Sequence, residues 1–172
     1  MTSLKTRGFY YKIYTLLPMI ILFISVLNEF DFNYLNLDYF SFNFPFILIF
    51  FFTIKEFKHF DYLLVFFAGL INDVVMGFPL GISSLSYLVV CFFGNYVRNK
   101  SVNTTIASDW LTFFIALIFA NLLFFSLLNN FSDVTTTFTK IGYNTFFTLF
   151  AFPVFWLLFN LYQMSFIGSQ DA

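Results

Sequence analysis

The chain has 172 residues, of which 60% are hydrophobic and 26% aromatic, whereas only 10% are charged. Soluble domains carry about 25% charged residues, and a chain this short exposes much of its surface, so an independent water-soluble globule is nearly excluded. The net charge of −1 favours neither nucleic acid nor a disordered acidic tail. We therefore expect membrane lipid to surround most of this protein.

Uncharged apolar stretches of about 17–25 residues are typical of membrane-spanning helices. The stretch 62–97 is too long for one span, and two glycines and a proline at 77–81 divide it into two. We also expect Pro45 near the start of one span and Pro153 as a kink in another. The chain thus predicts one all-α domain with six spans, in order about 13–30, 39–54, 62–76, 82–97, 110–128 and 141–162.

The distribution of basic residues predicts the orientation of these spans, because short cytoplasmic loops retain Lys and Arg. With the N-terminus in the cytoplasm, only Lys140 lies outside, and the other seven lie inside: Lys5, Arg7, Lys12, Lys55, Lys58, Arg98 and Lys100. An even number of spans returns the C-terminus to the cytoplasm. Because 27–30 offers no small-residue cleavage site, we expect the first span to be a retained signal anchor.

Asp73 is the one ionisable residue inside an expected span, and intramembrane carboxylates are candidates for function. In a structural interpretation Asp73, helped by Asn72, hydrogen-bonds Ser83, Ser84 or backbone amides of the facing helix. The alternative is direct binding of a ligand or cation. We expect the structural role.

Several features argue against an enzyme and against a bound metal or cofactor. The chain has one cysteine, Cys91, and one histidine, His59, too few for a metal site built from several thiolates or imidazoles. His59 and Ser83 are expected on opposite sides of the membrane, so no base reaches that serine. Asp109 lies just before the fifth span, on the opposite face from Asp73. No catalytic, metal or cofactor residue is predicted.

The segment 69–85 reads GLINDVVMGFPLGISSL. It resembles the signature region of the rod shape-determining protein MreD family, which has Gly-Leu-x-x-Asp, then Gly-x-Pro-Leu-Gly, then a helix start rich in small residues that ends in Leu. Candidate structural or partner-binding residues follow from this match: Gly69, Asp73, Gly77, Pro79, Leu80, Gly81, Ser83 and Ser84.

The resemblance implies a non-enzymatic, multi-pass scaffold in the inner membrane of bacteria. Such a scaffold belongs to the cell-elongation machinery and controls rod shape and peptidoglycan synthesis. Its expected partner is an MreC-like bitopic protein and, through it, the elongation transpeptidase and glycosyltransferase. Nucleic acid is not an expected partner.

An alternative from another functional class is also open, because the MreD family is distantly similar to the substrate-binding S-components of energy-coupling vitamin transporters. Those proteins typically present an Ala-x-x-x-Ala face on their first helix, and 14–27 contains no such pair. Ala116 and Ala120 have this spacing in the fifth span, where they predict a close approach between helices.

Overall fold

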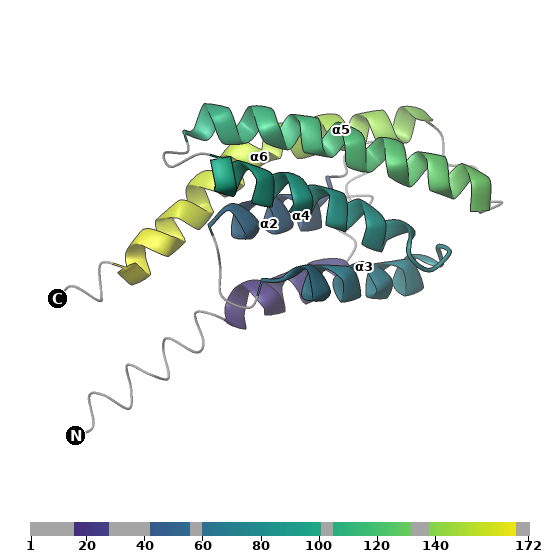
Figure 1. Ribbon diagram of the computed structural model, residues 1–172, viewed down its shortest axis with the longest axis horizontal. Coiled ribbons are helices and arrows are strands. Elements are labelled where there is room, and N and C mark those ends of the chain that lie inside the picture. The colour runs from purple at the N-terminus through teal and green to yellow at the C-terminus, as the bar shows by residue number, and fades with distance from the viewer. Residues whose placement is uncertain (1–15, 28–41, 56–59, 101–104, 132–137, 168–172) are drawn as a thin grey trace, which may run out of the picture.

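A computed structural model describes residues 16–27, 42–55, 60–100, 105–131 and 138–167 of the chain. Within these ranges the protein forms six helices and no strand (Figure 1), which confirms the predicted all-helical class. The helices are Leu16–Leu27, α2 (Phe44–Ile54), α3 (Tyr62–Met76), α4 (Ile82–Lys100), α5 (Ile106–Phe131) and α6 (Phe138–Ile167).

The helix bounds agree with the predicted span at α3 and differ elsewhere. Helix α2 begins at Phe44, not at 39, because Phe42 and Asn43 are not helical and Pro45 occupies the first turn. A proline there costs no hydrogen bond, since the first amides of a helix have no partner within it. Helices α4, α5 and α6 extend beyond their predicted spans, and residues 13–15, 28–30 and 39–41 lie outside the described ranges.

Two of the described helices are long and apolar enough to cross a membrane, Ile106–Phe131 and Ile141–Gln163 within α6. Helix α2 has 11 residues, which gives a length of about 16 Å against a hydrocarbon core of about 30 Å. The described helix is therefore shorter than the span 39–54 predicted from sequence, whose first three residues lie outside the described ranges. The six-span topology stays a prediction.

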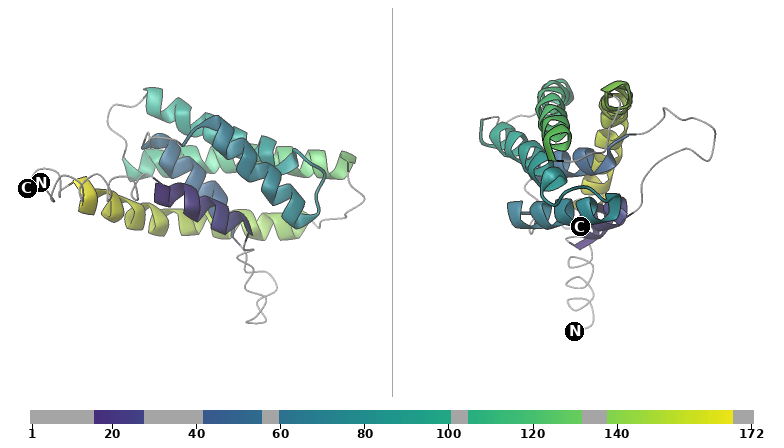
Figure 2. Two further views of the ribbon diagram at one scale, coloured as in Figure 1. Left: turned by 90° about the horizontal axis from the view of Figure 1, so that it is seen from below. Right: turned by 90° about the vertical axis from the view of Figure 1, so that its right-hand side faces the viewer.

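Helix α2 forms the centre of the molecule. All of its residues are buried, and it packs against α4 and α6 (Figures 1 and 2). A helix that is apolar on every side is buried on every side, and its sequence FPFILIFFFTI fits that rule. Aromatic rings connect α2 to α5 and α6. The ring centroid of Phe50 in α2 lies 5.1 Å from that of Phe113 in α5 and 5.8 Å from that of Phe152 in α6.

Helix α4 packs against α3 on one side and α5 on another, and α5 also packs against α6. Ala116 and Ala120 of α5 are completely buried, as a close approach between helices requires. Pro153 lies inside α6, where a kink was expected, and the C-terminal, yellow end of α6 diverges from α5 in Figure 1.

Candidate functional site

The segment singled out by sequence forms the hairpin between α3 and α4, hereafter the 69–85 hairpin. Helix α3 ends at Gly77, whose φ of 69° and ψ of 25° are left-handed. The next amide, of Phe78, donates to the carbonyl oxygen of Asp73 at 2.9 Å and closes the last turn. The chain then reverses through Gly81 (φ 105°), and Leu85 donates to the Gly81 carbonyl at 2.9 Å as α4 begins.

Asp73 caps the helix that follows it. Its side chain is 0% exposed, and its Oδ2 accepts a hydrogen bond from the Gly81 amide at 2.7 Å while Oδ1 accepts one from the Ser83 amide at 2.8 Å. The first amides of a helix lack partners within it and carry partial positive charge, so a carboxylate there is doubly favourable. The hydrogen bonds to backbone amides that the structural interpretation predicted are therefore present.

Neighbouring polar side chains tie the same two helices together. Asn72 Nδ2 donates to Ser83 Oγ at 2.8 Å, as expected. Ser84 does not reach Asp73; its hydroxyl donates to the carbonyl oxygen of Phe66 on α3 at 3.0 Å. Both Asp73 oxygens accept hydrogen bonds from backbone amides and the side chain is fully buried, which favours the structural role over direct binding of a ligand or cation.

Gly69 lies at a close contact between α3 and α4. A Cβ added there would lie 2.3 Å from Ser84 Cα and 2.6 Å from Ser84 N, both backbone atoms. Only glycine fits this position without a backbone shift. The resemblance to MreD named Gly69 as a candidate, and the structure supplies a packing reason for it.

The two turn glycines should tolerate substitution unequally. Gly77 has the left-handed conformation that asparagine also adopts, whereas the φ of 105° at Gly81 is accessible to few residues besides glycine. We expect Gly77→Asn to cost under about 1 kcal/mol and Gly81→Asn about 2 kcal/mol or more of unfolding free energy. Neither site has an atom within 4 Å of an added Cβ, so steric contact does not confuse the comparison. Detergent-solubilised protein titrated with SDS gives the measurement, and equal losses would contradict the prediction.

The remaining two candidates lie at the tip of the hairpin. Pro79 is half-buried, and its carbonyl oxygen accepts from the Ile82 amide at 3.4 Å. Leu80 is 70% exposed and takes no part in the packing between α3 and α4. The ring of Phe78 lies 5.5 Å from that of Phe124, which connects the hairpin tip to α5.

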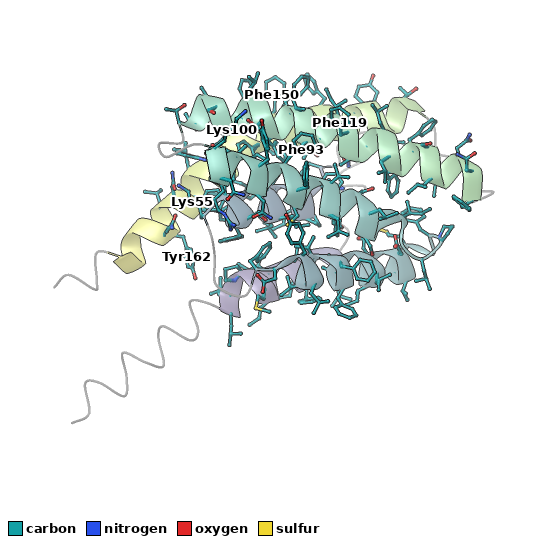
Figure 3. The ribbon with its side chains drawn as sticks, viewed as in Figure 1. Lys55, Phe93, Lys100, Phe119, Phe150 and Tyr162 are labelled. Carbon is teal, nitrogen blue, oxygen red and sulfur yellow. The ribbon has the colours of Figure 1, made fainter. Side chains whose placement is uncertain are left out.

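An apolar groove of about 680 Å³ lies between α4 and α5, hereafter the α4/α5 groove. Leu85, the last residue of the hairpin segment, lines it together with Phe92 of α4 and Leu122 of α5. Phe93 and Phe119 also line it and stack on one another at 5.6 Å between centroids (Figure 3). The hairpin therefore forms one end of this groove.

A second polar cluster, which sequence analysis missed, surrounds Asp109. Sequence placed this residue before the fifth span, but α5 begins at Ile106, so Asp109 lies in its first turn and is 0% exposed. Its Oδ2 accepts from Trp156 Nε1–H at 3.1 Å. The ammonium of Lys55 lies 5.8 Å from the centroid of the same Trp156 ring. No spacing pattern in the sequence connects these residues, which come from α5, α6 and the residue that follows α2.

Cys91 and His59 are the other residues that sequence analysis considered for chemistry. Cys91 is buried, with Thr53 Oγ1 at 3.6 Å from its sulfur, as expected of a packing residue. His59 lies outside the described ranges. Among the residues that the structure describes, no three His, Cys, Asp or Glu side chains gather into a possible metal site.

Comparison with known proteins identifies no relative: no family model, curated protein or solved structure matches the chain. The resemblance to the MreD family therefore rests on the 69–85 segment, together with chain length and hydropathy.

Proposed function

We propose that this protein is a non-enzymatic, MreD-like scaffold of the inner membrane, which acts in bacterial cell elongation by binding an MreC-like bitopic partner. The observation that carries the proposal is the 69–85 hairpin. The residues that match the MreD signature include those that close the turn, cap α4 and allow α3 and α4 to come into contact.

The arrangement of charge supports the proposed orientation. Lys55 and Lys100 lie toward the same end of the molecule (Figure 3), and Lys100 is the last residue of the 19-residue helix α4, whose first residues belong to the hairpin. In the six-span topology that we propose, the basic end faces the cytoplasm and the hairpin faces outward. Both chain termini are then cytoplasmic.

We propose that the α4/α5 groove receives the single transmembrane helix of the partner. The groove is mostly apolar, and in lipid a helix can pack its side chains into such a groove through van der Waals contact. It is continuous with the hairpin through Leu85, and the contact of Phe78 with Phe124 links the hairpin tip to α5. A change in the hairpin would therefore change the groove.

Filling the groove should release the partner without unfolding the scaffold. We expect Leu122→Trp to reduce the MreC-like protein recovered from native membranes about tenfold, because the indole occupies the space that the partner needs. Leu157→Trp on α6 is the matched control, since both leucines are 55% exposed and Leu157 does not line the groove. Quantitative mass spectrometry of the affinity-purified protein gives the measurement.

The same purification tests the alternative function. Recovery of an MreC-like protein supports the scaffold, whereas two ATPase subunits would identify a transporter S-component. Partner recovery that is unchanged by Leu122→Trp, with an MreC-like protein still present, would reject the groove as the docking surface and leave the scaffold function standing.

A further inference from the structure

The buried carboxylate of Asp109 has a hydrogen-bond partner for only one of its two oxygens. Oδ2 accepts from Trp156 Nε1–H, whereas Oδ1 is buried with no partner among the described residues. A buried acceptor without a donor is unfavourable, and more so when it carries charge. Among the residues that the structure describes, no group donates a hydrogen bond to this oxygen, and a cationic donor would satisfy it best.

A positive charge lies close by but is held on aromatic rings. Lys55 follows the last residue of α2, is half-buried, and places its ammonium 5.8 Å from the centroids of both Phe51 and Trp156. The indole of Trp156 thus contacts both groups: Lys55 over its face and Asp109 at its ring nitrogen. One positive and one negative side chain are therefore held side by side.

We propose that Asp109 and Lys55 bind the headgroup of an aminophospholipid, phosphatidylethanolamine. Its primary ammonium donates to Asp109 Oδ1, and its phosphate pairs with the Lys55 ammonium. Only a ligand that carries both charges satisfies both side chains. Because Asp109 is enclosed, the ammonium enters when the long, partly exposed side chain of Lys55 swings toward the phosphate.

The same contacts favour ethanolamine over other common headgroups. Choline has no N–H group to donate to Asp109 Oδ1, so its headgroup leaves that oxygen without a hydrogen bond. An anionic glycerol headgroup would satisfy Lys55 and leave Asp109 without a cation.

The location of the cluster also suits a lipid headgroup. Lys55 lies toward the same end as Lys100 and Tyr162 (Figure 3), the end that we place at the cytoplasmic interface. Tryptophan is enriched at such interfaces, where its ring is apolar and its N–H is polar. The proposal rests on the membrane location proposed above and is independent of the scaffold function.

The test uses the full chain in nanodiscs of phosphatidylcholine alone, with added phosphatidylethanolamine, or with added phosphatidylglycerol. Lipid retention is read by native mass spectrometry and the midpoint of thermal unfolding by tryptophan fluorescence. We expect wild-type protein to retain and be stabilised by phosphatidylethanolamine specifically. Asp109→Asn and Lys55→Met should each weaken this retention about tenfold or more.

Two exposed residues supply matched controls. Lys100→Met removes another lysine that lies over a ring, at 5.1 Å from the Tyr96 centroid, and Asp61→Asn removes an exposed carboxylate. Both variants should keep the wild-type lipid preference. The comparison of lipids with wild-type protein needs no variant, so it stands even where a substitution prevents folding.

Equal retention of phosphatidylethanolamine and phosphatidylcholine would overturn the proposal, as would preference for phosphatidylglycerol or retention unaffected by Asp109→Asn. Tighter binding of soluble glycerophosphoethanolamine than of the lipid would assign the site to a water-soluble ligand and overturn it too. Extraction of the chain from membranes by carbonate would instead reject the membrane location, so the two failures are distinguishable.

Discussion

Replacing Asp73 by alanine is expected to lower the free energy of unfolding by about 3–5 kcal/mol, because it leaves the part-buried amide of Gly81 and the buried amide of Ser83 without an acceptor. Each of these hydrogen bonds involves a carboxylate, and each orphaned donor adds its own desolvation cost. Asp73→Asn should cost less than Asp73→Ala but still about 2 kcal/mol of unfolding free energy. An NH₂ group replaces one of the two carboxylate oxygens, and it cannot accept the hydrogen bond of the backbone N–H that it faces.

Asp61→Ala is the matched control for this change. Asp61 is an exposed carboxylate that directly precedes α3 and makes no capping hydrogen bond. The free energy of unfolding should be measured by SDS titration of protein in mixed micelles, with circular dichroism as the readout. An Asp73→Ala variant as stable as Asp61→Ala would show that the cap does not hold the hairpin together.

Gly69→Ala is the second substitution with a large expected effect. Its methyl group would lie within 2.3 Å of the Ser84 backbone, so α3 and α4 must move apart and lose packing along their shared face. Overpacking of this kind generally costs about 1–3 kcal/mol of unfolding free energy. Because the added methyl group meets backbone atoms, which cannot move aside as a flexible side chain can, we expect a loss of about 3 kcal/mol.

Gly142→Ala provides the control, because it makes the same chemical change within helix α6 where an added Cβ meets nothing within 4 Å. It should leave stability unchanged or raise it by up to about 1 kcal/mol, as expected when alanine replaces glycine in a helix. The same SDS titration measures both variants. Similar stabilities for the two would refute the close contact between α3 and α4.

Much of the hairpin could be predicted from sequence because its signals are local. Gly77, Pro79 and Gly81 interrupt an apolar run, and Asp73 lies within a turn of that break, so a capping role needed no long-range information. The role of Gly69 differs. Its contact with Ser84 depends on how α3 and α4 pack, and nothing near Gly69 in the chain reveals it.

The cluster around Asp109 could not be predicted for the same reason. Lys55 directly follows α2, Asp109 lies in the first turn of α5 and Trp156 lies within α6, and each has an ordinary local context beside or inside an apolar helix. Their proximity follows from the central position of α2. Sequence analysis also expected a longer α2, because hydropathy counts apolar residues and does not show where the helix begins.

By itself, the sequence predicted the all-helical class from its long apolar runs, and its turn residues predicted where the chain reverses. These properties depend on composition and on neighbours in the chain. Only the tertiary structure decided which apolar residues form the core. Phe50 and Phe152 are buried while Phe119 and Phe150 are exposed, and all four occur in similarly apolar runs. In a chain this apolar, hydropathy does not distinguish a protein neighbour from a lipid one, so packing alone separates them.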